Sequence, residues 1–157
     1  MNDNRGLWRG KRKDNGEWIE GHFTRLDDNS AAIIPHIYGY GEVEVGEDTL
    51  GECTGLLDKN GKLIFEGDIV KGRAYSSEWR GVIVWISVIA GFGVRYWPRE
   101  TPTAWENSSI LKQMTRGKKD EFAAEIVGNI HDNPELLKFA IGEDNGNAAQ
   151  DALSPAT

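Results

Sequence analysis

The sequence is poor in cysteine and proline, and each shortage excludes a class of structure. Cys53 is the only cysteine among 157 residues, so the chain cannot form an internal disulfide. Five prolines stand against 19 glycines, which recur at short intervals and favour many short strands over long helices. No amphipathic stretch of helical period exceeds about three turns, the usual length of a helix. We therefore expect a mainly β protein.

Long apolar runs are also absent. The most apolar run, at 82–90, is too short to cross a bilayer as a helix, and the N-terminal segment MNDNRGLWRG lacks the apolar core of a signal peptide. A lone unpaired thiol is typical of proteins in a reducing compartment. We expect a cytoplasmic protein with no membrane partner.

The residues that most often carry chemistry do not form a recognisable site. His22, His36 and His131 lack the spacings of a metal site. No glycine-rich segment has the strand-to-helix context that cradles phosphate. Cys53 is expected to be a small, partly buried side chain rather than a nucleophile. The sequence thus predicts no catalytic, cofactor-binding or metal-ligating residue, and we expect a protein that is not an enzyme.

Turn chemistry is abundant, most clearly in the segment TGLLDKNGKLIFEGDIVK at 54–71. Asp58 can accept a hydrogen bond from the backbone two residues on, and Gly61 supplies the positive φ of a type I turn with a bulge. A type I′ turn on the Asn-Gly pair is the alternative. Either turn pairs the flanking apolar runs as antiparallel strands. Glu66 and Asp68 flank a further glycine turn, which explains them without a catalytic role.

The remaining elements follow from the same signals. A second Asn-Gly hairpin joins 7–13 to 17–23, and further strands are expected at 31–35, 42–45, 81–89, 94–97, 108–114 and 125–131. The strictly alternating 42–45 predicts a half-exposed or edge strand, and 71–79 is expected to be a loop. Asn133 and Pro134 predict the start of a short C-terminal helix. The polar tail after it is expected to be disordered.

Charge is unevenly distributed along the chain, whose net charge is −7. Residues 1–25 hold six basic and four acidic side chains, whereas 26–58 hold eight acidic and no basic ones. Overall acidity argues against broad, sequence-independent nucleic-acid binding, which needs many Lys and Arg side chains to neutralise phosphates. It leaves room for a local basic patch. The acidic segment suits a basic partner or the basic hairpin of another copy.

One candidate patch lies in the first hairpin and comprises Arg9, Lys11, Lys13, Trp8 and Trp18. Strand alternation predicts that the three basic residues share one face, with Arg12 on the other. Small β-barrels often bind nucleic acid by combining such charges with stacking aromatics. The simpler interpretation, which we favour, is a solvated hairpin over an aromatic core that Trp8, Trp18 and Phe23 form together. A second basic patch consists of Lys112, Arg116, Lys118 and Lys119.

Four blocks of this sequence resemble, in the same order, the YopX family of bacteriophage and prophage proteins. They are RGKRKDNGEWIEG, TGLLDKNGKLIFEGDIVK, GVIVW followed by GFGV, and IVGNIHDNPELL. Together they cover most of the chain, whereas residues 27–42 and 98–120 lie outside the four blocks.

The resemblance implies a phage or prophage origin, and hence the cytoplasm of a host bacterial cell. It implies a small SH3-like barrel with an N-terminal β extension. On this basis we expect the extension at 1–53, the barrel and short C-terminal helix at 54–141, and a disordered tail at 142–157. The resemblance brings no catalytic residue to any position.

Three functional hypotheses follow. The first is a non-enzymatic interaction protein that self-assembles or binds a host or phage protein, because short strands and a sheet edge offer surfaces for pairing. The alternative is a small β-barrel that binds nucleic acid, which is not favoured because the chain is acidic. An enzyme acting on a host metabolite has the least support, since no nucleophile–base or metal pattern is present.

Overall fold

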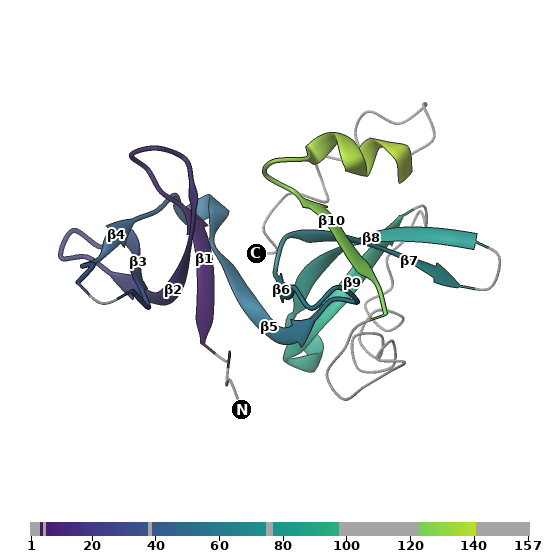
Figure 1. Cartoon of the computed structure of the whole chain (residues 1–157), viewed down its shortest axis with the longest axis horizontal. Coiled ribbons are helices and arrows are strands. Elements are labelled where there is room, and N and C mark those ends of the chain that lie inside the picture. The colour runs from purple at the N-terminus through teal and green to yellow at the C-terminus, as the bar shows by residue number, and fades with distance from the viewer. Residues whose placement is uncertain (1–3, 5, 38, 75–76, 98–122, 141–157) are drawn as a thin grey trace. The chain divides into compact units, whose positions relative to one another are not determined.

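The computed structural model describes residues 4, 6–37, 39–74, 77–97 and 123–140, and it confirms a mainly β protein (Figure 1). The strands of the described residues form two antiparallel sheets, with orders β4-β3-β2-β1-β5-β6 and β10-β7-β8-β9. The chain divides into two compact units, 1–57 with 63–66 and 58–62 with 67–157. The boundary expected after Cys53 therefore falls inside strand β5, and the tail expected at 142–157 lies outside the described residues.

The first unit contains the six-stranded sheet. Its elements are β1 (Leu7–Lys11), β2 (Trp18–Arg25), β3 (Ala31–Pro35), β4 (Val43–Glu44), the 3₁₀ helix η1 (Glu47–Thr49), β5 (Gly51–Leu57) and β6 (Leu63–Phe65). The Asn-Gly turn joins β1 to β2 as the sequence predicts, and β4 lies at one end of the strand order. The edge strand expected from the alternating segment is thus confirmed.

Strand alternation divides the side chains of this sheet between two faces. One face holds the larger core, in which half-buried aromatic and aliphatic side chains surround the fully or almost fully buried Ala31, Ile33 and Val45. The other face holds a small cluster of Leu7, Cys53 and Phe65. Cys53 is buried and its sulfur accepts a hydrogen bond from the N–H of Gly55 (3.4 Å), in keeping with its expected role as a packed side chain.

The central hairpin has the type I turn with a glycine bulge, not the type I′ alternative. Gly61 has a φ of 80°, whereas Asn60 is not among the residues of positive φ that a type I′ turn requires. The turn is closed by hydrogen bonds between the backbones of Asp58 and Lys62 (2.7 Å) and of Gly61 and Asp58 (2.9 Å). The hairpin arms belong to the first unit and the turn belongs to the second.

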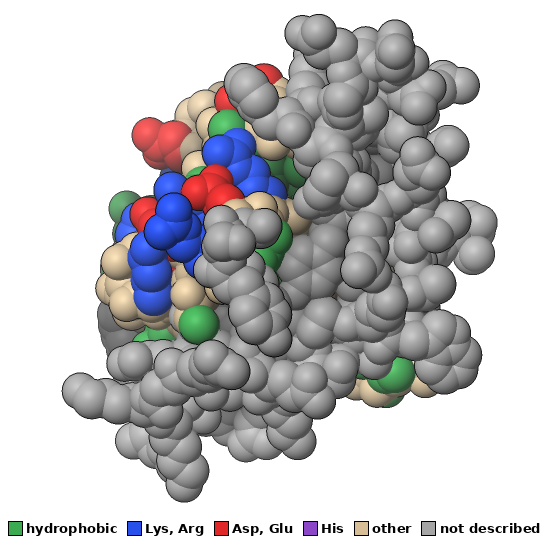
Figure 2. Space-filling view, turned by 90° about the vertical axis from the view of Figure 1, so that its right-hand side faces the viewer, with side chains coloured by type: hydrophobic (Ala, Val, Ile, Leu, Met, Phe, Trp, Pro, Cys, Tyr) green, Lys and Arg blue, Asp and Glu red, His purple; other side chains and the backbone are tan. Residues whose placement is uncertain are grey.

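The second unit contains the four-stranded sheet. Its elements are β7 (Asp68–Ala74), β8 (Ser77–Ile86), the 3₁₀ helix η2 (Ser87–Ile89), β9 (Gly91–Trp97), β10 (Glu125–Asn129) and the 3₁₀ helix η3 (Pro134–Ala140). Charged side chains gather on the side of the molecule shown in Figure 2, with a few acidic groups among the basic ones.

The strand expected at 108–114 lies outside the described residues.

Two expectations for this unit were wrong. Residues 71–74 and 77–79 lie in strands rather than in a loop, because β7 pairs with β8 through Lys71 opposite Arg80 and Arg73 opposite Glu78. These strand ends carry charged rather than apolar side chains, so they lack the apolar alternation from which a strand is predicted. The C-terminal helix is a 3₁₀ helix, with the N–H of Leu136 donating to the carbonyl of Asn133 three residues back (3.0 Å).

One buried cluster of the second unit lies between one face of the sheet and η3. Ile69 of β7 and Val82 of β8 stand opposite each other and form a buried cluster with Leu137 of η3. Asp68 precedes this pair and is itself almost fully buried. The apolar half of this sheet face is thus filled by η3.

Candidate functional site

Arg9, Lys11 and Trp18 lie on one face of the β1–β2 hairpin, as alternation predicts for the two basic residues. Lys11 stands opposite Trp18 in the register. The guanidinium carbon of Arg9 and the Nζ atom of Lys11 lie 4.9 Å and 5.5 Å from the centre of the Trp18 ring. Arg9 also lies 4.9 Å from the ring centre of Phe65. We call these four residues the cation–aromatic face; its contacts are cation–π interactions.

Trp8 lies on the opposite face of the same strand. Its ring centre is 5.3 Å from that of Phe23, and both rings pack against the buried core of the first unit. The expectation that Trp18 joins these two rings was wrong, because Trp18 pairs with Lys11 and so points to the other side of the sheet.

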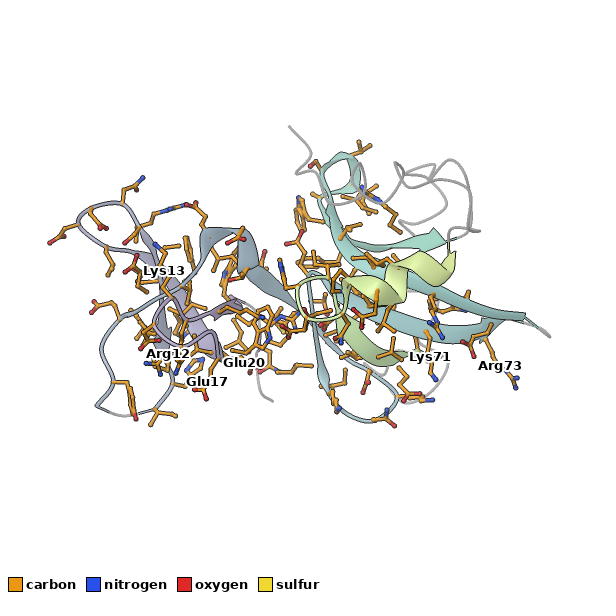
Figure 3. The ribbon with its side chains drawn as sticks, turned by 90° about the horizontal axis from the view of Figure 1, so that it is seen from above. Arg12, Lys13, Glu17, Glu20, Lys71 and Arg73 are labelled. Carbon is orange, nitrogen blue, oxygen red and sulfur yellow. The ribbon has the colours of Figure 1, made fainter. Side chains whose placement is uncertain are left out.

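Lys13 does not share the cation–aromatic face. Strand β1 ends at Lys11, and Arg12 forms an isolated bridge with Val45, so the alternation expected to continue to Lys13 stops there. The Nζ atom of Lys13 instead lies 2.5 Å from a carboxylate oxygen of Glu44. This hydrogen bond raises the pKa of Lys13. Figure 3 shows where Arg12 and Lys13 lie in the first unit.

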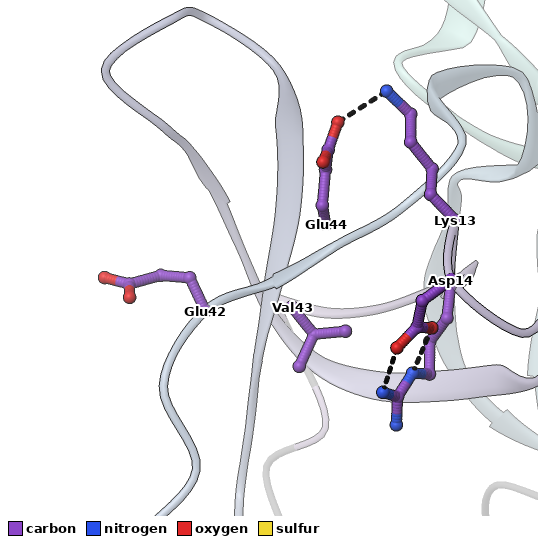
Figure 4. A pocket seen from close by; sticks show the side chains of 6 residues that line it. Lys13, Asp14, Glu42, Val43 and Glu44 are labelled. Carbon is purple, nitrogen blue, oxygen red and sulfur yellow. Dashed lines mark hydrogen bonds and ion pairs between the residues drawn. The ribbon is translucent and has the colours of Figure 1, made fainter.

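An open pocket of about 420 Å³ lies beside this ion pair (Figure 4). Its lining residues are Arg12, Lys13, Asp14, Glu42, Val43 and Glu44. Arg12 donates two hydrogen bonds to Asp14, which lower the pKa of the Asp14 carboxyl and raise that of the Arg12 guanidinium. The charged groups of the pocket are therefore largely paired with one another.

Part of the acidic segment is neutralised by the chain itself. Glu47 lies 2.5 Å from Arg25, and Glu44 pairs with Lys13. Asp28 accepts hydrogen bonds from the hydroxyl and the N–H of Ser30, which lower its pKa. These carboxylates have partners within the first unit, which leaves less of the segment for a basic partner.

The other residues considered from the sequence are dispersed. His22 and His36 lie in edge-to-face contact, with ring centres 4.6 Å apart. Among the described residues, no group of three or more His, Cys, Asp or Glu side chains is arranged to hold a metal ion. Glu66 and Asp68 fall in different compact units. The patch of Lys112, Arg116, Lys118 and Lys119 lies outside the described residues.

A second cationic surface was missed by sequence reasoning. The register places Lys71 and Arg73 of β7, Arg80 of β8 and Arg95 of β9 on one face of the four-stranded sheet. Glu78 shares this face, opposite Arg73 and 3.5 Å from Arg80. We call these five residues the basic sheet face. The spacing of Lys71 and Arg73, two residues apart, is a strand signal that could have revealed it.

The turn between β8 and β9 exposes apolar side chains. Trp85, Val88 and Ile89 are 45%, 75% and 39% exposed, and we call them the hairpin tip. The Trp85 ring is in edge-to-face contact with Phe92, with centres 5.0 Å apart. Ala90 closes the turn in the left-handed conformation, with a φ of 47°. Apolar surface held out in this way is typical of interaction sites.

No helix in the described part of the chain is both long and apolar enough to cross a membrane.

Comparisons with known proteins identify relatives of this chain. The model of the family described as YopX protein matches residues 7–138. Among solved structures, the chain is similar to the crystal structure of protein EF1440 from Enterococcus faecalis. The two are 28% identical, the match covers 83% of this chain and 96% of that one, and the TM-score is 0.45. A search of curated proteins found no match.

Proposed function

Because the chain belongs to the YopX family, we propose that it is a non-enzymatic interaction protein that associates with further copies of itself. The hairpin tip supports this function, since it exposes Trp85, Val88 and Ile89 together. Aromatic side chains are enriched in the residues that dominate protein interfaces. An apolar patch is complementary to itself and can be covered by the same patch of a second copy.

The proposal includes the finer features that the family resemblance implies. These are a phage or prophage origin, action in the cytoplasm of a host bacterium, and an SH3-like barrel in the second unit. The antiparallel sheet β10-β7-β8-β9 is consistent with part of such a barrel. Other partners from the host or the phage would use the same apolar tip.

Light-scattering chromatography over a wide concentration range tests self-association. We expect the wild-type protein to run as a dimer or larger species. The double substitution Val88→Glu, Ile89→Glu should weaken association at least tenfold, because it places two charges in an apolar contact. Lys62→Gln is the control, since this exposed residue of the same unit lies in the β5–β6 turn.

A wild-type protein that stays monomeric at every concentration contradicts self-association. Capture of a tagged protein from its host, with and without nuclease, would then test the broader proposal of a host partner.

A second candidate function is nucleic-acid binding, and the cation–aromatic face favours it. Arg9 and Lys11 lie over Trp18, and basic groups beside an aromatic ring are typical of proteins that bind single strands. Binding should weaken steeply with salt and fall when Arg9, Lys11 and Lys13 are replaced by Ala. No mobility shift with single-stranded or duplex probes at low salt would exclude this candidate.

A further inference from the structure

The basic sheet face concentrates positive charge on an otherwise acidic protein. Lys71 and Arg80 stand directly opposite each other on β7 and β8, and like charges in such a pair repel. Lys71 and Arg73 follow each other along one strand (Figure 3). Arg95 is opposite Val82, so it lies diagonally from Arg80 on the same face. The arrangement favours an anionic ligand that relieves this repulsion.

The carboxylates of this face do not neutralise it. Glu78 is shared between Arg73, which stands opposite, and Arg80, at 3.5 Å. Glu125 stands opposite Lys71 but is bound to Lys59 at 2.6 Å. Among the described residues, two acidic groups therefore meet Lys59, Lys71, Arg73 and Arg80, which leaves an excess of two positive charges.

The chemistry of the face fits phosphate better than a protein surface. Three of its four basic residues are arginines, whose planar guanidinium groups bind phosphate oxygens in pairs. The cores of protein interfaces are built around apolar and aromatic side chains. None of the exposed large apolar side chains in the described part of the chain lies on this face. Interfaces with nucleic acid are polar and strongly positive.

The tryptophans of β8 point away from this face. Trp79 stands opposite Gly72, one residue out of phase with Lys71 and Arg73, and a Cβ added at Gly72 would overlap the Trp79 ring. Trp85 has the same parity along β8 and shares that opposite face. The described aromatic side chains of β8 cannot stack on bases at the basic sheet face. The basic side chains of the face offer contacts to phosphates, which carry no sequence information.

We propose that the basic sheet face binds the phosphate backbone of duplex nucleic acid without reading its base sequence. This inference rests on the second candidate function, nucleic-acid binding, and gives it a different site. The ligand is a duplex because its paired bases are stacked internally and its two phosphate strands present a broad anionic surface to the sheet.

Fluorescence anisotropy with a labelled DNA duplex tests this site in the full chain. The affinity of the wild-type protein should fall as salt rises, with a logarithmic slope of about −3 to −4 for four phosphate contacts. The double substitution Lys71→Gln, Arg73→Gln should lower the affinity by about tenfold and reduce the slope by about 2. Duplexes of different sequence should behave alike.

The matched control is Arg12→Gln, Arg25→Gln, which removes two positive charges from the first unit outside the cation–aromatic face and should leave duplex binding within about twofold of wild type. Lys11→Gln, Lys13→Gln is a separate variant that tests the cation–aromatic face. Thermal unfolding of each variant reports whether it folds, and Arg80→Gln provides a second variant should the first be unstable. If Lys71→Gln, Arg73→Gln binds like wild type while Lys11→Gln, Lys13→Gln loses binding, the site is wrong and the second candidate function stands.

Two further outcomes overturn the inference. A wild-type protein that binds no duplex at low salt excludes the site, and a single-stranded probe then tests the second candidate function separately. Equal binding of polyglutamate, with the same dependence on Lys71 and Arg73, shows a general polyanion surface and contradicts the assignment to nucleic acid.

Discussion

Asp58 holds the central turn of the chain through a fully buried carboxylate. Its Oδ1 atom accepts hydrogen bonds from the N–H groups of Asn60 (2.8 Å) and Lys62 (2.9 Å). Its Oδ2 atom accepts from the N–H of Ile126 (3.1 Å), at the start of β10. The sequence predicts the first of these bonds from turn chemistry, but the bond to Ile126 spans 68 residues and has no local signal.

Replacement of Asp58 should therefore destabilise the protein strongly. Asp58→Ala leaves three backbone donors without their acceptor, and we expect a loss of about 3 kcal/mol in the free energy of unfolding. Asp58→Asn retains one acceptor oxygen and should lose less. Chemical denaturation measures both, with the exposed Asp27→Asn as control. Equal stability of Asp58→Ala and the control would show that the buried carboxylate has no structural role.

Glu125 offers a test by pH. A hydrogen bond from Lys59 lowers the pKa of the Glu125 carboxyl, with a smaller contribution from the charge of Lys71. A lowered pKa means that the folded state favours the ionised form. This stabilisation is therefore present above the ordinary carboxyl pKa and is lost as pH falls through the lowered value.

Lys59→Gln should accordingly raise the pKa of Glu125 toward its ordinary value, because the Lys59 hydrogen bond is its largest cause. An NMR titration of the Glu125 carboxyl carbon measures the change, and Lys62→Gln should leave it unmoved. A Glu125 pKa that is the same in all three proteins would mean that the Lys59 contact does not persist in solution.

At the scale of the strands, β2 and β3 approach so closely at one point that only glycine fits. A Cβ on Gly21 would overlap the backbone carbonyl of Ile34 on β3, whereas a Cβ on Gly41 would meet nothing within 4 Å. Neither residue has a positive φ. A comparison of alanine at these two positions therefore measures the cost of the steric overlap alone, without a contribution from backbone conformation.

We expect Gly21→Ala to lower the free energy of unfolding by about 3 kcal/mol, since a rigid backbone cannot move aside as a flexible side chain could. Gly41→Ala should change it by less than about 0.5 kcal/mol. Denaturant unfolding compares the two. If both variants match wild type, β2 and β3 are farther apart in solution than in this structure.

Elements were predictable where their signal is local. The Asn-Gly and Asp-Lys-Asn-Gly turns carry their own chemistry, so both hairpins were identified correctly. The β7–β8 pairing was missed because its exposed half alternates charged residues with glycine and lacks an apolar stripe. The basic sheet face was missed with it, since a residue taken to lie in a loop has no assigned face.

At the scale of the whole molecule, the charged side chains are divided unequally between the two units. The first unit contains six basic and twelve acidic side chains, and the second contains twelve and thirteen. The first unit therefore carries most of the net negative charge, which opposes nucleic-acid binding at the cation–aromatic face. The second unit is close to neutral and is the better place for an anionic ligand.

The first unit is not a continuous segment, so fragments of the chain can test which residues it needs in order to fold. It includes residues 63–66, which contain β6, and Phe65 of this strand packs with Leu7 and Cys53. A fragment 1–66 keeps all six strands of the first sheet, whereas a fragment 1–53 loses β6 and most of β5. We expect 1–66 to unfold cooperatively at reduced stability, since domains of this size bury only about 60% of their unfolded surface.

Fragment 1–53 should show no cooperative transition, because Leu7 and Cys53 lose the ring of Phe65 that covers them. Circular dichroism during heating and the dispersion of amide NMR signals distinguish the two fragments. A cooperatively folded 1–53 would place the boundary where the family resemblance implies it, after Cys53. Two unfolded fragments would show instead that the first sheet does not fold without residues that follow 66.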